Sequence, residues 1–412
     1  MKIRMMAAAL ALVAGSARAE PVGDWMEAAF TRLREATRPT GPGPQPNRSP
    51  ATMAAPGRVA AAMFEAANAA DRRYRPYFGI APANGPASPE AAVSVAAHGV
   101  LVAVFPDKKA PLDEALAFNL SRIADGPAKL EGERIGREAA KAALARVVFD
   151  PAGPFPPYVP PTPPGLYDST TDPGPPPWVF GYKPWLLPSL KAVQPAPPPP
   201  LTSEAYTRSY EETKRVGAKE STARTPAQTA TARFWIEAED PEQTLRAVFG
   251  RPGRRLVDNA RLNALVRMTQ IDAVMVIDTS KLEILRWRPV TAIRLGEKDG
   301  NPATAGDPNW EPLLRTPMSP EYPCGHCTGA STFAALMEAE LGERTADARF
   351  ASSAMPGAGI AGMRWADYAR QASESRILGG VHFRYSAEAG EKLGRDIAQA
   401  ARANFAPPLG RK

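Results

Sequence analysis

The stretch LVDNARLNALVRMTQIDAVMVI, residues 256–277, decides the fold class of this chain. It is mostly apolar and too long for a β-strand, so we predict a buried helix that ends near Asp278. Further helical patterns cover residues 25–33, 58–73, 91–105, 112–123, 134–148, 203–216, 226–237, 241–249, 327–341 and 387–405. Almost no segment alternates with period two. The sequence therefore predicts an all-α fold, a helical bundle.

A proline-rich segment separates two helical regions. Nineteen of the 46 prolines fall in residues 151–200, where they exclude helix interiors and favour extended backbone. Aromatic residues such as Trp178 and Trp185 are interspersed with them, which is unusual in a disordered linker. We therefore predict an ordered strap packed on the body, with a flexible linker as the alternative. The expected division is an N-terminal helical half, the strap, and a catalytic C-terminal half packed on the first, each half built like a four-helix bundle: residues 20–150, 151–200 and 201–412.

The chain begins with the pattern of a secretory signal peptide over residues 1–19. Lys2 and Arg4 precede a short apolar core, residues 5–14, and an Ala-Arg-Ala cleavage pattern ends at residue 19. The apolar core is too short to span a bilayer, and no later segment is long and apolar enough. We expect a secreted protein without a transmembrane segment, most simply in a bacterial periplasm.

The charge of the chain argues against a nucleic-acid-binding protein. The formal net charge is +7, but the basic residues are scattered, and no basic run is interleaved with aromatic residues. A basic surface can attract anionic small molecules. We expect small-molecule substrates and no nucleic-acid partner, and the sequence is compatible with a homodimer as well as a monomer.

Three separated segments carry cations and amides suited to an oxyanion. They read KLEILRWRP (281–289), PCGH (323–326) and, in the third, Ser375-Arg376 followed six positions later by His382. Arg288 and Arg376 supply forked donors that match tetrahedral oxygens, and Lys281 adds a point charge. Gly325 stands at a predicted helix start, where first-turn amides bind anions and no side chain obstructs the approach.

Two of the three histidines lie in these segments. His382 is suited to bonding the central atom of the oxyanion, and His326 is then available for proton transfer. A cationic pocket disfavours protonation of an imidazole, which keeps His382 available as a ligand or nucleophile.

The order of the motifs resembles that of a known superfamily. The pattern Lys-x6-Arg-Pro, then Pro-Ser-Gly-His, then Ser-Arg-x5-His-x3-Asp is shared by vanadium-dependent haloperoxidases, bacterial non-specific acid phosphatases and type-2 phosphatidic acid phosphatases. The stretch WRPVTAIR (287–294) and residues 299–323 look most like the bacterial haloperoxidase branch. The resemblance reaches upstream to TARFW near Trp235 and, more faintly, to residues 60–77, so it covers most of the chain.

The resemblance implies specific roles. His382 would be the ligand of vanadate, or the nucleophile that becomes phosphohistidine in a phosphatase, and His326 the acid–base group. The equatorial oxygens would be bound by Lys281, Arg288, Cys324, Gly325 and Arg376, with Lys281 also catalytic. The sequence departs from the pattern twice: Cys324 replaces the serine of the second motif, and Ser386 replaces the aspartate that closes the third. A thiol is a weaker donor than a hydroxyl, and a ligating histidine usually needs a carboxylate partner.

The resulting functional prediction is peroxide-dependent oxidation of a halide at a histidine-bound vanadate, that is, a vanadium-dependent haloperoxidase. Acid phosphatase activity, which needs no vanadate, is the close alternative. A non-catalytic oxyanion binder is a lesser one.

The pattern Cys-Gly-His-Cys, residues 324–327, leaves a further alternative. It is the active-site pattern of disulfide isomerases, so a thiol–disulfide oxidoreductase that uses Cys324 and Cys327 is conceivable in an oxidising compartment. Residues 317–323, however, do not form the strand that a thioredoxin-like fold requires before this motif. The sequence favours instead a local Cys324–Cys327 disulfide that stiffens the anion-binding turn, and such a bond would leave no thiol to contact the anion.

Overall fold

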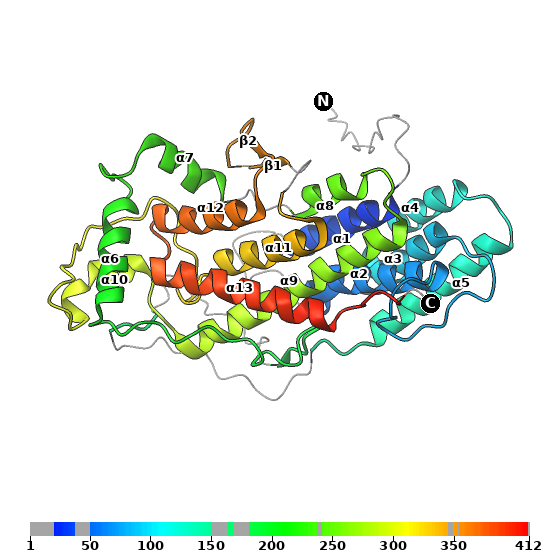
Figure 1. Cartoon of the computed structure of the whole chain (residues 1–412), viewed down its shortest axis with the longest axis horizontal. Helices are drawn as coiled ribbons and strands as arrows, with labels where there is room; N and C mark the ends of the chain where they lie inside the picture. The colour runs from blue at the N-terminus through cyan, green and yellow to red at the C-terminus, as the bar shows by residue number, and fades with distance from the viewer. Residues whose placement is uncertain are drawn as a thin grey trace, which may run out of the picture.

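The computed structural model describes residues 20–37, 50–149, 164–167, 181–236, 241–344, 349–352 and 354–410. This part of the chain is built from helices that run mostly along the long axis of the molecule (Figure 1). The predicted all-α class is therefore confirmed. The expected signal peptide lies outside the described residues. Among the described helices, none is long and apolar enough to cross a membrane.

The N-terminal helices pack around α2, whose many alanines allow close contact with its neighbours α1, α3, α5 and α9. A Cβ atom added at Gly136 of α5 would lie 2.6 Å from the carbonyl oxygen of Ala92 on α3, so glycine is required where these two helices meet. These elements are α1 (Pro21–Thr37), α2 (Pro50–Ala70), α3 (Pro89–Val104), η1 (Pro106–Lys108), α4 (Lys109–Ser121) and α5 (Pro127–Ala145).

The C-terminal helices form a second group that includes α9. This long helix contacts α2 on one side and α11 and α13 on the other, and α11 in turn packs against α12 and α13 (Figure 1). Its members are α9 (Leu256–Ile284), α11 (Gly325–Leu341), α12 (Trp365–Leu378) and α13 (Arg384–Asn404). The sequence-based division into two halves at the strap stays a prediction.

Shorter elements surround these groups. They are α6 (Glu204–Val216), α7 (Pro226–Phe234), α8 (Pro241–Phe249), α10 (Pro289–Arg294), η3 (Gly296–Lys298) and the antiparallel pair β1 (Arg349–Ala351) and β2 (Gly359–Ala361). Neither this hairpin nor α12 was expected from the sequence. In α12 the buried residues Trp365, Tyr368, Ala369 and Ala372 have helical spacing, but this apolar pattern is short because Ser375 and Arg376 continue the buried face. The predicted helix that ends near Asp278 instead continues to Ile284, which brings Lys281 into its last turn.

Residues 182–187, in the described part of the proline-rich segment, contact α9. The fully buried carboxylate of Asp272, on α9, accepts hydrogen bonds from the amides of Trp185 (2.7 Å), Leu186 (2.7 Å) and Leu187 (3.1 Å) and from the Tyr182 hydroxyl (3.1 Å). One buried side chain therefore accepts four hydrogen bonds from residues 182–187. The rest of the predicted strap, residues 151–163 and 168–180, lies outside the described residues.

Candidate oxyanion site

The first motif wraps around the C-terminal end of α9. The helix stops at Leu285, whose amide still bonds the Lys281 carbonyl at 2.9 Å and whose left-handed backbone (φ 51°) then turns the chain out of the helix. Arg288 then caps the start of α10. The side chain of Lys281 is buried and donates to the backbone carbonyls of Pro320 and Glu321. This motif therefore reaches the loop that precedes the second one.

Arg288 links the first motif to the third and to the loop before the second. Its Nε donates to the Ser319 carbonyl at 2.7 Å and its Nη2 to the Ser319 hydroxyl at 3.0 Å. Its Nη1 donates to the Val381 carbonyl and to Nε2 of His382, both at 2.9 Å. Only 2% of Arg288 is exposed, so the guanidinium group is held inside the protein by these acceptors.

The second motif begins α11. The Tyr322–Pro323 peptide bond is cis, Cys324 is the N-cap and Gly325 the first helical residue. A Cβ atom at Gly325 would lie 3.8 Å from Cε of Lys281, so the N-terminus of α11 lies beside that lysine. The first-turn amides of a helix attract anions, and here they stand next to a buried cation.

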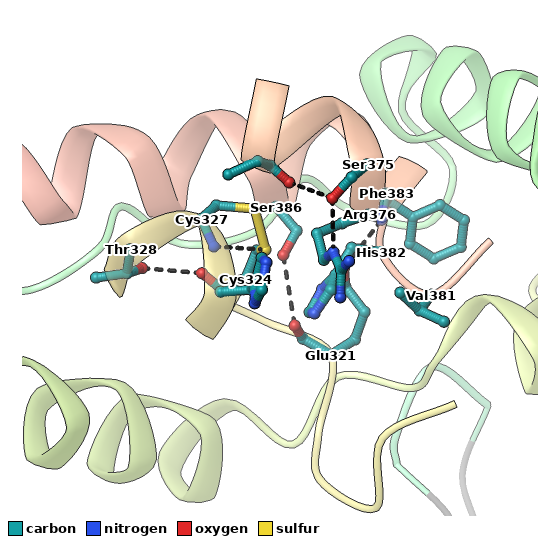
Figure 2. The surroundings of a disulfide bond; sticks show 12 residues. Glu321, Cys324, Cys327, Thr328, Ser375, Arg376, Val381, His382, Phe383 and Ser386 are labelled. Carbon is teal, nitrogen blue, oxygen red and sulfur yellow. Dashed lines mark hydrogen bonds and ion pairs between the residues drawn. A yellow bond between two sulfur atoms is a disulfide. The ribbon is translucent and has the colours of Figure 1, made fainter. Parts of the chain in front are cut away.

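Cys324 does not supply the donor that the resemblance assigned to it. It forms a disulfide with Cys327, so no S–H group is present, and its Sγ accepts the Cys327 amide at 3.2 Å as a helix cap (Figure 2). The expected local disulfide is confirmed, and the expected role of the Cys324 side chain as an oxyanion donor is wrong. The reason is the spacing, because the N-cap and the third helical residue lie close enough to bond. Both cysteines are fully buried, which disfavours the thiol–disulfide exchange alternative.

The third motif places His382 between α12 and α13. The backbone carbonyl of Arg376 accepts the amides of Val381 (3.1 Å) and His382 (3.3 Å), which fixes the turn. The Nε of Arg376 donates to the Ser375 hydroxyl at 3.0 Å (Figure 2). The positive charge of Arg376 also contributes to lowering the pKa values of His326 and His382, so its side chain is electrostatically part of the site.

Glu321 is the one residue of this site that the motifs did not reveal. Its Oε1 lies 2.9 Å from Nδ1 of His382 and accepts the Phe383 amide at 3.0 Å. The carboxylate is fully buried, and Figure 2 shows it beside His382, Arg376 and Ser386. Burial raises its pKa above the ordinary value, while the Phe383 amide and the cations Arg288 and Lys281 oppose that rise. The only sequence signal was an acidic residue two positions before Pro323.

The partners of His382 fix its tautomer. Burial, and then the charges of Arg288 and Lys281, lower its pKa well below the ordinary value, so the ring is neutral. A guanidinium group can only donate, so Nε2 accepts from Arg288, and the single ring proton must be on Nδ1. That proton is donated to Glu321. Nε2 therefore carries a lone pair, as a ligand or nucleophile requires.

His326 has the opposite tautomer. Its Nε2 lies 2.8 Å from the carbonyl oxygen of Trp235, which can only accept, so the ring proton is on Nε2. Burial, followed by the charge of Arg376, lowers the pKa of His326 to about 3. The imidazole is neutral near pH 7, and Nδ1 is the atom able to take up a proton.

Three cations of the site, Lys281, Arg288 and Arg376, are buried. The carboxylates of Glu321 and Asp278 act on Lys281, and that of Glu321 acts on Arg288. Burial and the charge of Arg288 lower the pKa of Lys281 well below its usual value. Burial likewise lowers the pKa of Arg288 to about 10. An anion with several negative charges would relieve this repulsion.

One known family and several solved structures are similar to this chain. Residues 261–407 match the family described as the VCPO second helical-bundle domain. All three motifs of the chain lie within this matched range. The chain is similar to the structure of a bacterial vanadium-dependent iodoperoxidase, with a TM-score of 0.70 and 19% identity over 95% of this chain and 98% of that one.

Two further solved structures, of the apo and holo types of a bacterial vanadium-dependent chloroperoxidase, are also similar. Their TM-scores are 0.66 and 0.64, both at 17% identity and over 85% of this chain, and they are covered over 92% and 90% of their own lengths. At these identities the likeness shows a shared fold. No curated protein sequence matches the chain.

Proposed function

We propose that this chain, which belongs to the vanadium haloperoxidase superfamily through its second helical-bundle domain and its fold, binds vanadate at His382 and oxidises a halide with hydrogen peroxide. One observation carries the proposal. The lone pair of His382 Nε2 lies among three buried cations, Lys281, Arg288 and Arg376, whose positive charges all act on that ring. Such a site suits a multiply charged oxyanion that also accepts a nitrogen ligand.

The residues present fit vanadate. The donors are two arginines, a lysine and the first amides of α11, all of which suit tetrahedral or trigonal-bipyramidal oxygens. The Nη1 of Arg288 donates to Nε2 of His382, so binding requires this donor to turn from the nitrogen to the anion. The half-cystine at position 324 contributes no side-chain donor.

The chain's own residues have separate tasks in this reaction. When bound, vanadate would activate hydrogen peroxide toward attack by a halide. Lys281, Arg288 and Arg376 hold the oxygens and offset their charge. His326, neutral near pH 7, takes up and returns protons at Nδ1, while its Nε2–H stays bonded to the Trp235 carbonyl.

Acid phosphatase activity is the second candidate, and the tautomer of His382 supports it. An Nε2 lone pair backed by a carboxylate at Nδ1 is a suitable nucleophile. In that reaction Nε2 bonds to phosphorus and the bond from phosphorus to the ester oxygen breaks. Nδ1 of His326 takes up a proton from water and passes it to the leaving oxygen. Water then hydrolyses the phosphohistidine, releases phosphate and restores the histidine.

We further propose that the protein is exported, as its N-terminal pattern indicates. The Cys324–Cys327 disulfide supports this, because disulfides persist in oxidising compartments such as the periplasm. Mass spectrometry of the protein from a periplasmic extract would test it. Retention of residues 1–19 would contradict export by cleavage.

A paired assay on purified protein tests the function. One arm adds vanadate and follows peroxide-dependent halogenation of a dye with iodide, bromide or chloride. The other arm omits vanadate and follows phosphate release from a generic ester. Halogenation that His382→Ala abolishes, and that His98→Gln retains, supports the haloperoxidase. His98 is a matched control because it is the only histidine outside the site, on α3.

The other outcomes have defined meanings. Phosphate release without halogenation assigns the chain to phosphatase chemistry. Vanadate or phosphate binding without turnover in either arm identifies a non-catalytic oxyanion binder. Tight vanadate binding by His382→Ala would show that the site assignment is wrong.

A further inference from the structure

The carboxylate that a ligating histidine needs is absent from its expected place in the third motif. Position 386 carries serine, and its hydroxyl is buried and donates to the backbone carbonyl of Glu321 at 3.4 Å. Without a carboxylate acceptor at Nδ1, an imidazole has no strong preference between its two tautomers and is a weaker base at Nε2. The site would then hold its oxyanion poorly.

The carboxylate acceptor for Nδ1 of His382 comes instead from a distant part of the sequence. Glu321 lies 61 positions before His382, in the loop that leads into α11, and its Oε1 bonds both Nδ1 of His382 and the amide of Phe383. The two bonds fix the ring and the backbone that carries it. We propose that Glu321 is the positioning residue of His382 and takes over the role of the aspartate that position 386 lacks.

The small side chain at position 386 is part of the same arrangement. Ser386 bonds the backbone of Glu321, and its own carbonyl accepts the Cys324 amide at 3.3 Å. An aspartate there would add a second buried negative charge beside Glu321, which is costly. The carboxylate therefore comes from the loop before the second motif, and the third motif carries a neutral residue at position 386.

This inference rests on the proposed oxyanion function, but its first test does not need turnover. With only three histidines in the chain, nitrogen-15 NMR of histidine-labelled protein at fixed neutral pH can assign each ring. We expect the Nδ1–H tautomer for His382, with a strongly deshielded Nδ1 proton, and the Nε2–H tautomer for His326. An Nε2–H tautomer at His382 would overturn the proposal, whatever the variants do.

The second test moves the carboxylate. Glu321→Gln should shift the Nδ1 proton of His382 to higher field and weaken the binding of vanadate and of inorganic phosphate, each about 10- to 100-fold by calorimetry. Glu321→Gln combined with Ser386→Asp returns a carboxylate to the third motif and should recover most of that loss. A purely structural role for Glu321 would not predict this rescue.

The matched control is Glu65→Gln. Glu65 is also buried and accepts three backbone amides, those of Tyr77, Phe78 and Ile80, but it lies on α2. The Glu65→Gln variant should have a lower melting temperature than wild type and the same affinity for vanadate and phosphate. Wild-type affinity in Glu321→Gln, or a double variant no better than Glu321→Gln, would overturn the proposal. A wild-type protein that binds phosphate but neither binds vanadate nor oxidises halide contradicts only the haloperoxidase assignment.

Discussion

Nη1 of Arg288 lies 2.9 Å from Nε2 of His382, the atom that we propose as the vanadate ligand. The same guanidinium group is fixed by Ser319 on its other edge, through Nε and Nη2. Arg288 therefore does two things at once: it protects the lone pair of Nε2 from a proton, and it is placed to meet an incoming anion. Loss of its paired guanidinium donors should lower the affinity for an anion more than the free energy of unfolding.

Arg288→Lys keeps the positive charge and replaces the planar guanidinium donors with a single ammonium group. We expect vanadate and phosphate to bind about 10- to 100-fold more weakly, because charged hydrogen bonds of roughly 1.5–3 kcal/mol are lost. Calorimetric titration measures this. Arg294→Lys is the control, since Arg294 ends the helix α10 that Arg288 precedes, and its Nε donates to the Trp310 carbonyl outside the site. Equal affinity losses in both variants would contradict a specific role for Arg288.

Close packing of α13 on α11 holds the anion-binding turn in place. A Cβ atom at Gly390 would lie 2.6 Å from the carbonyl oxygen of Cys324 and 3.1 Å from Cβ of Cys327. Gly390→Ala should push the helices apart, lower the free energy of unfolding by about 1–3 kcal/mol and weaken phosphate binding. Gly329→Ala on α11, where a Cβ would meet nothing within 4 Å, should be neutral or slightly stabilising. The prediction fails if Gly390→Ala unfolds at the same urea concentration as wild type.

The Cys324–Cys327 disulfide closes a short loop at the start of α11. Removing it with the double change Cys324→Ala and Cys327→Ala should lower the free energy of unfolding by about 2 kcal/mol on the chain-entropy estimate. The Gly325 amide then becomes less ordered, so vanadate affinity should also fall. A Cys324→Ser, Cys327→Ala protein restores a hydroxyl and should bind vanadate more tightly than the double alanine variant. Indistinguishable affinities would show that the turn needs neither the bond nor the hydroxyl.

The sequence predicted those candidate residues of this site that belong to motifs. Lys281, Arg288, Arg376, His326 and His382 were identified because each belongs to a motif of fixed spacing. The interactions in the structure bring Lys281, Arg288 and His382 into direct hydrogen-bonding relation with one loop, residues 319–321. The long apolar run of α9 likewise predicted a central helix correctly, because apolar length is a local property.

What the sequence could not predict depends on contacts across the fold. Glu321 and His382 are 61 positions apart, and no spacing rule links a loop glutamate to a ring nitrogen there. The role of Cys324 depended on whether its sulfur met Cys327 or solvent, which only the backbone geometry of the helix start decides. The helix α12 was missed because its buried face is partly polar, with Ser375 and Arg376 inside the site rather than in an apolar core.

Asp272 anchors the strap to α9 through four hydrogen bonds, from three backbone amides and the Tyr182 hydroxyl. Asparagine has one acceptor oxygen, and its NH2 group would face donors. Asp272→Asn should therefore lower the free energy of unfolding by about 2–4 kcal/mol, because buried amides lose their acceptors. Urea unfolding followed by tryptophan fluorescence measures this. The control is Asp396→Asn, because the carboxylate of Asp396 is exposed and pairs with Lys392. An equal decrease in the free energy of unfolding in this variant would contradict the anchoring role of Asp272.

The lowered pKa of His326 links folding to pH. The folded protein holds this ring at a pKa of about 3, against an ordinary value of 6.5 in the unfolded chain. Between these values the unfolded state binds the extra proton. The stability contributed by neutral His326 is therefore complete above pH 6.5 and is lost as pH falls toward 3, with about 2 kcal/mol lost by pH 5. His326→Gln keeps a donor for the Trp235 carbonyl and cannot titrate. Its free energy of unfolding should fall less between pH 7 and pH 5 than that of wild type, and parallel curves for the two proteins would show that His326 is not held neutral by its surroundings.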